Sequence, residues 1–418
     1  MILSPRFLPI EAMMPETISA QCCIAGGGPA GMMLGLLLAR AGVSVVVLEK
    51  HGDFLRDFRG DTLHPSTLEI MHELGMLERF LRLPHQKVYR INGQFGDLEF
   101  TVADFSHLPT HCRYVAFMPQ WDFLNFLVEE GSRYPTFQVR MSAEVTDLIE
   151  NEGSVVGLRA ETPNGLLEVR AALVVGADGR HSIVRKKAGL SVEEFGAPMD
   201  VLWFRLSRKP DDPVDPMGRF DAGRIFIMLN RGDYWQCGLV IAKGSLAEVR
   251  AQGISAFRES VAKLAPFVSD RVHELQEWEP IKLLTVQVDR LRQWYKPGLL
   301  CIGDAAHAMS PVGGVGINLA IQDAVATANL LWQPLREGRL SEADMAKVQT
   351  RRAWPTRVTQ RIQLTVQNRV ISRVLDRKSP LTPPYALRLL ARFPYLRRIP
   401  ARMIGLGVRP EHVRTPVN

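Results

Sequence analysis

Cysteine is scarce in this chain of 418 residues: there are five, an odd number, and none forms a Cys-x-x-Cys pair. This pattern fits neither a disulfide framework nor a zinc site. No metal is therefore expected, and a reducing cytoplasmic location is expected instead. Long hydrophobic runs are also lacking. The stretch Ile24 to Ala39, which consists of apolar residues, glycine and proline, is shorter than the ~20 residues that a membrane span needs. No basic segment followed by an apolar stretch stands at the N-terminus, so no signal peptide is expected.

Acidic residues are scarce toward the C-terminus. Residues 336–418 hold 18 basic and five acidic residues, whereas the remainder holds 33 basic and 39 acidic residues. An acidic body without a recognisable motif argues against a nucleic-acid partner. The basic part alternates apolar and cationic residues from Tyr385 to Phe393. It is interpreted as a helical cap over the substrate domain, with peripheral contact to an anionic membrane as the alternative.

Apolar patterns predict the order of elements. Residues 21–25 and 43–48 predict buried strands and residues 31–41 a helix between them, which makes a βαβ unit with parallel strands. Further helices are predicted at 66–80, 121–134 and 317–333, and further buried strands at 167–175 and 299–302. The segments 201–207, 224–230, 234–242 and 281–288 predict a mostly antiparallel sheet.

A glycine-rich turn, Gly26-x-Gly28-x-x-Gly31, joins the first strand to the first helix. Gly26 permits a tight turn, Gly28 lets backbone N–H groups approach a pyrophosphate, and Gly31 allows close helix–strand packing. Glu49 ends the second strand, where a carboxylate can accept hydrogen bonds from a ribose. In this βαβ context the turn predicts a dinucleotide site rather than a merely flexible loop.

A second glycine-rich segment follows the predicted strand 299–302. It comprises Gly303–His307 and Ser310–Asn318. The carboxylate of Asp304 can bind the ribityl hydroxyls of a flavin, and the helix that follows can direct N–H groups at the flavin ring. NAD needs no such second site, so the two segments together favour FAD.

Three segments in order, at Gly26–Gly31, Asp178-Gly179 and Gly303-Asp304, resemble the single-component FAD-dependent monooxygenases of the para-hydroxybenzoate hydroxylase superfamily over residues 20–335. The resemblance implies an α/β fold: a Rossmann-like FAD-binding domain of the glutathione-reductase type, an inserted mixed β-sheet substrate domain and a helical C-terminal region. The expected boundaries are 19–83, 112–190 and 291–340 for the FAD-binding domain, 84–111 and 191–290 for the substrate domain, 341–418 for the C-terminal region, and 1–18 for a disordered extension.

The resemblance also implies residue roles. Arg59 and Pro311 are the expected catalytic residues, because they match an arginine that contacts flavin or NAD(P)H phosphates and a proline beside the oxygen-carrying flavin carbon. Val315 departs from the pattern, since some members have a cation there; the backbone and helix dipole would then stabilise reduced flavin. The expected cofactor-binding set is Gly26, Gly28, Ala30, Gly31, Glu49, Lys50, Arg59, Gln120, Val145, Asp178, Asp304, Pro311, Gly314, Gly316, Ile317 and Asn318.

The implied activity is hydroxylation of an aromatic or electron-rich small molecule by a monomer or homodimer. NAD(P)H binds transiently and reduces tightly bound, non-covalent FAD; O₂ adds to give a C4a-hydroperoxide, and its distal oxygen passes to the substrate. A reductase or oxidase on the same fold, without oxygen insertion, is the alternative. A binding or regulatory module with a structural flavin is the alternative from another class.

Large side chains on the predicted antiparallel strands are the candidates for contacting the substrate. Because successive strand residues point to opposite faces, about half of them are expected to line a pocket and the others to be core. Arg205 either holds an acidic substrate or pairs at the surface, and the catalytic base is not identified. His307 is expected to pack under its loop, and His64 either caps the following helix or faces the pocket. The substrate set is Trp203, Arg205, Phe226, Met228 and Trp235.

Overall fold

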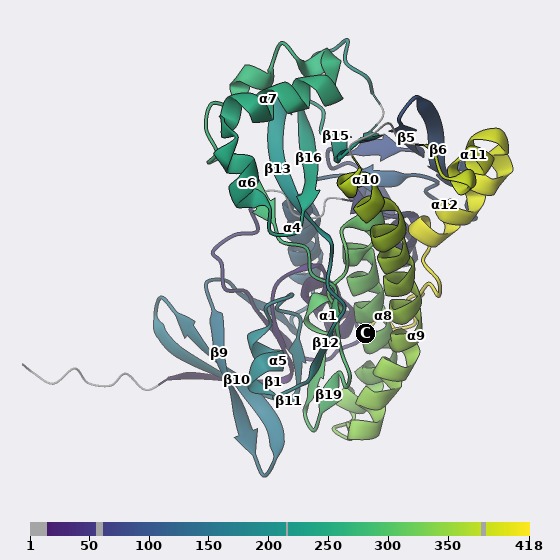
Figure 1. Cartoon of the computed structure of the whole chain (residues 1–418). Helices are drawn as coiled ribbons and strands as arrows, with labels where there is room; N and C mark the ends of the chain where they lie inside the picture. The colour runs from purple at the N-terminus through teal and green to yellow at the C-terminus, as the bar shows by residue number, and fades with distance from the viewer. Residues whose placement is uncertain (1–14, 56–61, 215, 378–381) are drawn as a thin grey trace, which may run out of the picture.

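The computed structural model describes residues 15–55, 62–214, 216–377 and 382–418. Two β-sheets lie one above the other in Figure 1, and the long helices α8 (Gly316–Arg336) and α9 (Glu342–Val366) run alongside them. Arg59 lies outside the described residues, as do residues 1–14 of the expected extension.

The lower sheet contains the predicted βαβ unit. β1 (Glu16–Ala25) pairs in parallel with β2 (Val45–Leu48) on one side and with β11 (Gly165–Gly176) on the other. The disordered extension was expected to reach residue 18, and this is wrong for Glu16–Ile18, because these residues pair with β11. The order is β19-β20-β11-β1-β2-β8, where β8 is Phe137–Arg140, β19 is Tyr295–Lys296 and β20 is Leu299–Cys301.

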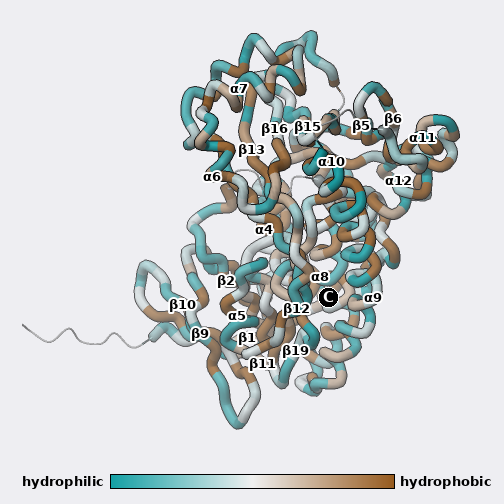
Figure 2. The backbone as a smooth tube through the Cα atoms, viewed as in Figure 1, coloured by the Kyte–Doolittle hydropathy of each residue, from teal (hydrophilic) through white to brown (hydrophobic). Residues whose placement is uncertain are grey.

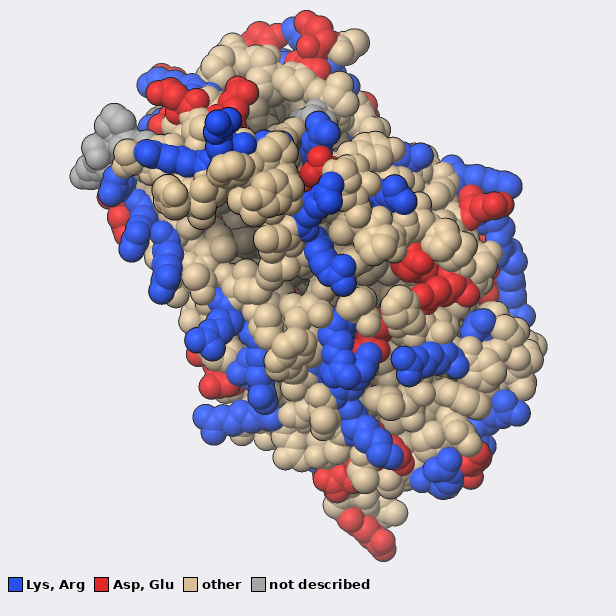
Figure 3. Space-filling view, turned by 90° about the vertical axis from the view of Figure 1, so that its right-hand side faces the viewer, with Lys and Arg blue, Asp and Glu red and all other residues tan. Residues whose placement is uncertain are grey.

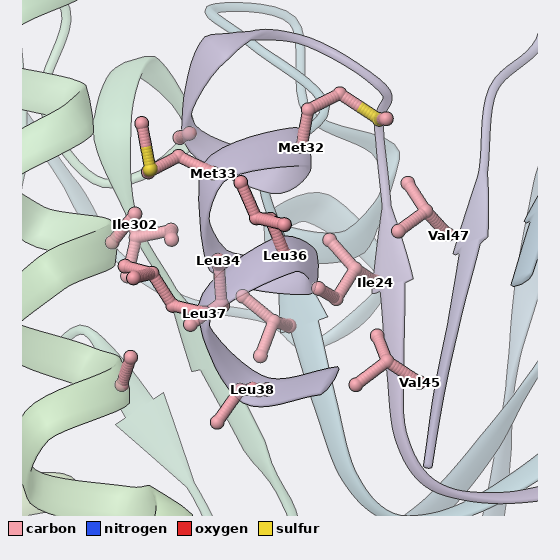
Figure 4. Close-up of a cluster of buried hydrophobic side chains, with 14 of the residues drawn as sticks. Ile24, Met32, Met33, Leu34, Leu36, Leu37, Leu38, Val45, Val47 and Ile302 are labelled. Carbon is pink, nitrogen blue, oxygen red and sulfur yellow. The ribbon is translucent and has the colours of Figure 1, made fainter. Parts of the chain in front are cut away.

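Helix α1 (Pro29–Arg40) is buried along its whole length except near its ends. Figure 4 shows its apolar side chains packed between the strands that carry Ile24, Val45 and Val47 and the segment that carries Ile302. Helix α8 packs on the same helix. Figure 2 shows the corresponding pattern over the whole chain, with hydrophobic segments in the strands of both sheets. Burial of α1 by strand, helix and loop fixes the position of its N-terminal turn.

Several short elements complete the lower half. The hairpin β9 (Glu144–Asn151) and β10 (Ser154–Thr162) extends β11 in antiparallel fashion and was not predicted. The helix predicted at 66–80 is interrupted at Gly75, whose φ of +69° cannot continue a helix. Its two parts and the remaining elements are α2 (Pro65–Glu73), α3 (Leu77–Phe80), β3 (Thr62–Leu63), β4 (Gln86–Val88), β7 (Val115–Phe117), α4 (Gln120–Gly131), α5 (Ile183–Lys187), β12 (Val192–Glu194) and β18 (Asp289–Leu291).

The upper sheet is mixed, as expected. β14 (Met217–Asp221) and β5 (Arg90–Phe95) pair in parallel, and the other neighbouring strands are antiparallel. The strand predicted at 281–288 is shorter, because after Leu284 the chain leaves the sheet and Val286 N donates to Asp200 Oδ1 (3.0 Å). The order is β17 (Lys282–Leu284), β13 (Met199–Ser207), β16 (Tyr234–Ala242), β15 (Arg224–Asn230), β14 (Met217–Asp221), β5 (Arg90–Phe95) and β6 (Leu98–Asp104).

Helices cover both faces of the upper sheet. On one face lie α6 (Leu246–Ala251) and α7 (Gly253–Leu264), which were not predicted. On the other lie a π-helical turn (Gln367–Ile371), α10 (Ser372–Asp376), α11 (Tyr385–Arg392) and α12 (Arg398–Gly405). The expected helical C-terminal region is thus confirmed, and α11 and α12 both pack on β6 (Figure 1). Within the described part of the chain, no helix combines the length and apolarity needed to cross a bilayer.

Candidate functional site

The first glycine turn brings three chain segments into contact. Gly26 has a φ of +100°, and a Cβ atom there would lie 2.5 Å from Ala177 O, so only glycine fits between β1 and the segment after β11. A Cβ atom on Gly31 would lie 2.0 Å from Gly26 O, which explains the close approach of helix and strand. Around Gly28, in contrast, a Cβ atom would meet nothing within 4 Å. The backbone of Gly28 is therefore open to a ligand.

The N-terminus of α1 is suited to an anion. Its first turn holds no acidic residue, and Gly28 supplies no side-chain cap, so the positive end of the helix dipole is not neutralised from within the chain. Glu49 is fixed beside it at the end of β2, where one carboxylate oxygen accepts Gly27 N (2.8 Å) and the other accepts His51 N (3.1 Å). Pyrophosphate and ribose groups match these two neighbouring environments.

The second glycine-rich segment lies directly against the first. Gly303 has a φ of +58°, and a Cβ atom there would lie 3.3 Å from Cβ of Ala30 in the first turn of α1 and 3.1 Å from Cβ of Ala320 in α8. Gly303 and Asp304 therefore stand between the N-terminal turns of α1 and α8. Segments that are far apart in the sequence thus form one continuous path from Glu49 past Gly28 to α8, which fits an extended FAD.

Asp178 lies beside the first glycine turn, but its carboxylate is engaged locally. A Cβ atom on Gly26 would lie 2.8 Å from Cα of Asp178. The carboxylate accepts Ser182 Oγ and Val184 N (3.1 Å), and so fixes the start of α5. Burial raises the pKa of the Asp178 carboxyl above its usual value, although these hydrogen bonds oppose the shift.

The loop from Ser310 to Val315, here called the Pro311 loop, leads into α8. Gly313 and Gly314 adopt φ values of +81° and +62°, which favour glycine at both positions. Gly314 O accepts Thr62 Oγ1 (3.2 Å), which ties the loop to β3. The first turn of α8 contains no acidic residue and no side-chain cap. Its N–H groups can therefore face an electron-rich ring edge, as expected for reduced flavin.

Asn318 fixes the start of α8 to the segment that begins α2. Its Oδ1 atom accepts His64 N (2.8 Å) and Thr67 Oγ1 (2.7 Å), and its Nδ2 atom donates to Thr62 O (3.0 Å). The residue is only 4% exposed. Asn318 is expected beside the flavin ring. In the structure its amide binds the segment from Thr62 to Thr67, and Nδ2 also donates to Gly314 O of the Pro311 loop (3.4 Å).

Three buried glutamines of α9 and the π-helical turn bind the chain at the Pro311 loop: Gln363 and Gln367 bind the loop itself, and Gln360 binds Ala308 just before it. Gln360 Nε2 donates to Ala308 O (3.2 Å), and Gln367 Nε2 donates to Ser310 Oγ (2.8 Å). Gln363 is bonded on both sides of its amide: it accepts Ser310 N (3.2 Å) and donates to Ser310 O and Val312 O (both 2.9 Å). Sequence reasoning missed these residues, although three glutamines at helical spacing were a visible signal.

His64 joins the Pro311 loop to the C-terminal helices. It is buried, and its Nδ1 atom lies 2.7 Å from Ile404 O in α12. Its Nε2 atom lies 3.7 Å from the position of a Cβ on Gly314. Burial lowers the pKa of His64 to about 4, so the imidazole is neutral at pH 7. The sequence predicts that His64 either caps α2 or faces the pocket. In the structure its side chain does not cap α2.

His307 packs under its loop, as expected. Its Nε2 atom lies 2.6 Å from Asp323 Oδ2, which also accepts Gly303 N (3.1 Å). The other Asp323 oxygen accepts Arg352 Nε (2.8 Å). Burial opposes ionisation of Asp323, but the charges and hydrogen bonds of His307 and Arg352 hold the pKa of this carboxyl below its usual value. This buried network supports the Gly303-Asp304 turn from beneath.

The remaining expected cofactor residues lie on the following elements. Gln120 begins α4, and Gly316 and Ile317 begin α8. Ala143 N donates to Glu49 O (2.8 Å), so Val145 follows a segment that adjoins the end of β2. Lys50 is exposed.

The upper sheet divides the expected substrate residues between its two faces. Phe226, Met228 and Trp235 are buried with Phe257 of α7, on the face away from the Pro311 loop. The alternation of the strands therefore makes these three residues core, and they do not line the site. Trp203 lies on the opposite face, in the cluster that includes Val312. Arg205 points to that face too, but it is exposed and its guanidinium lies 4.8 Å from the ring centre of Tyr234.

Together, the path along α1 and α8 and the facing sheet define a class of protein, the FAD-dependent aromatic monooxygenases. Comparison with known proteins agrees: the FAD binding domain family FAD_binding_3 matches residues 19–362, and the chain belongs to this family. The predicted fold of this chain is confirmed, and the cofactor of this enzyme is FAD. NAD(P)H is the co-substrate typical of these monooxygenases.

Individual relatives agree with this assignment. The chain is 32% identical over 395 residues to a 6-methylpretetramide 4-monooxygenase of Streptomyces rimosus, covering 94% of each protein. It is 29% identical over 325 residues to an uncharacterized aromatic compound monooxygenase of Bacillus subtilis, covering 75% of this chain and 61% of that longer protein. The crystal structure of p-nitrophenol 4-monooxygenase from Pseudomonas putida shares the fold, with a TM-score of 0.76, 22% identity and coverage of 94% and 100%.

Proposed function

We propose that this enzyme uses NAD(P)H and O₂ to hydroxylate an aromatic compound chemically related to 6-methylpretetramide. The single observation that carries the proposal is the contact between Gly303 and Ala30, which joins two glycine-rich segments into one extended cofactor path. The relative of matching length, named for that substrate, supports the choice of compound. Five buried, free cysteines support a reducing, cytoplasmic location.

Within this proposal, residues of this chain bind FAD, orient it and shield the reacting groups from water. Gly28 and the start of α1 would hold the pyrophosphate of FAD, and Asp304 would hold its ribityl chain. Bound FAD supplies hydride acceptance and activation of O₂. Pro311 would lie beside the bound flavin, in a loop that Gln363 and Asn318 hold through hydrogen bonds to Ser310 and Gly314. The apolar face of the upper sheet excludes water from the reacting groups, which protects a reactive oxygen species from side reactions.

The test begins with the cofactor. The purified protein should be yellow and release FAD, and Asp304→Ala should lower FAD occupancy markedly. Asp97→Ala, a change at an exposed turn residue of the upper sheet, is the matched control and should keep full occupancy. Unchanged FAD content in Asp304→Ala would refute the role given to this residue.

Oxygen insertion separates the proposal from the reductase or oxidase alternative. With 6-methylpretetramide as substrate under ¹⁸O₂, the product should gain one ¹⁸O atom for each NAD(P)H consumed. NAD(P)H consumption matched by H₂O₂, with no labelled product from any aromatic compound tested, would favour the alternative.

We further propose that the outer face of α11 and α12 contacts anionic membranes. Tyr385, Tyr395 and Ile399 are 74%, 63% and 60% exposed, and exposed arginines lie among them. Figure 3 shows the face that carries α9, α11 and α12, on which Lys and Arg outnumber acidic residues. Co-sedimentation with phosphatidylserine vesicles should occur at low salt and fall as salt is raised. Absence of binding at low salt would end this part of the proposal.

A further inference from the structure

A small pocket lies where helix α9 faces β12, β18 and the segment that follows β18, and its volume is about 190 Å³. A single water needs only about 10–15 Å³ of such space, so this pocket is large enough for a polyatomic ion. None of its lining residues belongs to the two glycine-rich segments of the cofactor path. The polar and aromatic groups of its walls come from Glu193, Arg290, Arg292, Trp294, Gln349 and Arg357.

Hydrogen bonds within the chain hold the frame of this pocket. Gln349 of α9 accepts Trp294 N (3.0 Å) and donates to Arg292 O (2.9 Å). Gln360 of the same helix donates to Asp289 O (2.7 Å) at the start of β18, and β18 pairs with β12. The walls are therefore in place before a ligand arrives, which lowers the conformational entropy lost on binding.

The charge of the pocket is positive, because three arginines and one glutamate line it. Arg290 is already paired: it donates to Glu193 Oε2 (2.9 Å) and to Gln360 Oε1 (3.0 Å). The guanidiniums of Arg292 and Arg357, in contrast, are exposed and form no hydrogen bond or ion pair with any residue that the structure describes. A concave surface with two unpaired charges of one sign concentrates counter-ions.

The chemistry of the two free guanidiniums limits the ligand. Each guanidinium presents its N–H donors in a planar fork that matches two oxygens of a carboxylate or a phosphate. A phosphate group carries a charge of about −1.5 to −2 at pH 7 and offers three strong acceptor oxygens. It therefore balances both Arg292 and Arg357, whereas a single carboxylate balances only one of them.

An exposed tryptophan stands next to one of these arginines. Trp354 is 54% exposed and precedes Arg357 by three residues on α9, a spacing at which helical side chains are neighbours. An exposed aromatic ring offers a stacking surface to a nucleic base. A nucleotide can thus contact both the ring and the arginines, whereas free phosphate contacts the arginines alone.

The inner wall of the pocket adjoins the buried network beneath the cofactor turn. Trp294 is fully buried, and its ring centre lies 4.9 Å from that of His307. His307 is bonded to Asp323, which also accepts Gly303 N. The pocket is therefore separate from the cofactor path but in contact with the network that supports it.

We propose that this pocket is a binding site for a phosphate group, held by the guanidiniums of Arg292 and Arg357. The group belongs either to free phosphate or to a nucleotide whose base stacks on Trp354. The site lies outside the cofactor path, so the inference does not depend on the proposed hydroxylase function.

The test is isothermal titration calorimetry of the FAD-loaded protein with inorganic phosphate and with AMP at low ionic strength. Bound FAD keeps the pyrophosphate site of the cofactor filled. The double variant Arg292→Leu, Arg357→Leu should bind both probes at least about tenfold more weakly than the unaltered protein. The matched control is the double variant Arg361→Leu, Arg369→Leu, which removes two exposed positive charges from α9 and the π-helical turn and should keep the affinity.

Comparison of the two probes identifies the source of the phosphate group. Tighter binding of AMP, with the difference lost in Trp354→Leu, indicates a nucleotide, and equal or tighter binding of inorganic phosphate indicates the free ion. Absence of binding for both probes at millimolar concentration would overturn the inference. Unchanged affinity in Arg292→Leu, Arg357→Leu would also overturn it, and so would an equal loss in both double variants, because net charge alone would then explain the binding.

Discussion

Asn318 shows how one side chain can determine the geometry of a cofactor site. Its amide uses both ends, accepting from His64 and Thr67 and donating to Thr62. Asn318→Ala should lower the free energy of unfolding by about 2–4 kcal/mol, because buried groups lose their partners. It should also weaken FAD retention. Urea unfolding and flavin release on ultrafiltration measure the two effects.

The control for this variant is Asn151→Ala, since Asn151 is exposed at the end of β9. It should leave both measurements close to those of the unaltered protein. If Asn318→Ala behaves like this control, the amide does not position the Pro311 loop.

His64 should give the protein a measurable pH dependence. Burial lowers its pKa to about 4 in the folded protein, whereas the unfolded chain titrates near 6.5. Between these values the unfolded state binds a proton that the folded state does not, so the free energy of unfolding should fall as the pH falls from about 6.5 to 4. The contribution of His64 to this loss is about 3 kcal/mol at most.

Denaturant unfolding between pH 7.5 and 4.5 measures this slope. His64→Gln should flatten it, whereas His181→Gln, a change at an exposed histidine, should not. A slope unaffected by His64→Gln would mean that other groups cause the pH dependence.

At the scale of single residues, the sequence predicts the glycines that tight turns require. It predicts poorly which groups the side-chain amides of asparagine and glutamine bind. Gly26, Gly31 and Gly303 follow from the turn chemistry, because a Cβ would clash at Gly26 and Gly31 and because the positive φ of Gly303 favours glycine. The hydrogen bonds of Gln363 depend on how α9 crosses the Pro311 loop, and no local pattern encodes that crossing. Phe226 and Met228 were assigned to the substrate site because the strand pattern gives alternation but not which face meets the flavin.

Helix α9 acts as a support for the loop beside it. Gln363 makes three hydrogen bonds to Ser310 and Val312, directly before the π-helical turn. Gln363→Leu removes all three and should destabilise the protein by about 2–3 kcal/mol. The displaced loop should also lower the yield of hydroxylated product per NAD(P)H consumed, because the flavin edge loses its fixed position. Product and NAD(P)H measured together give this coupling ratio.

Arg361→Leu changes an exposed residue on the same helix and serves as the control. It should keep the coupling ratio. A ratio that is unchanged in Gln363→Leu would assign the glutamines to stability alone.

Elements with strong periodicity or continuous apolar runs were predictable, and elements defined by tertiary contact were not. The buried apolar part of β1, and the strands β2 and β16, stand where expected. The pair α6–α7 forms only because it covers the face of the upper sheet that carries Phe204 and Trp235. The strand expected at 281–288 ends early because Asp200 binds the backbone at Val286.

A residue near the C-terminus links helix α9 to the buried network beneath the cofactor turn. Glu411 accepts two hydrogen bonds from Arg351 (2.7 and 3.0 Å) and one from the fully buried Arg352 (3.2 Å), which continues to Asp323. Glu411→Gln leaves a buried arginine incompletely paired and should lower the free energy of unfolding by about 3 kcal/mol. Because Asp323 also holds Gly303 N, FAD affinity should fall as well.

Glu337→Gln is the control, since it removes an exposed ion pair with Arg339, and such pairs contribute about 0–1 kcal/mol. Thermal unfolding of the FAD-loaded and FAD-free proteins separates the two expected effects. A Glu411→Gln variant with unchanged FAD affinity would show that the network supports the fold but not the cofactor turn.

The pairing of β1 with β11, and of β11 with β20, affects how the protein is made. During synthesis β1 leaves the ribosome early, but β20 and the start of α8 follow only after the entire inserted sheet has been translated. The nucleotide-binding fold of the nascent chain therefore stays incomplete until late in synthesis, and FAD binds only at the final stage of folding. Cells short of riboflavin should accumulate a full-length, protease-sensitive apoprotein rather than truncated chains.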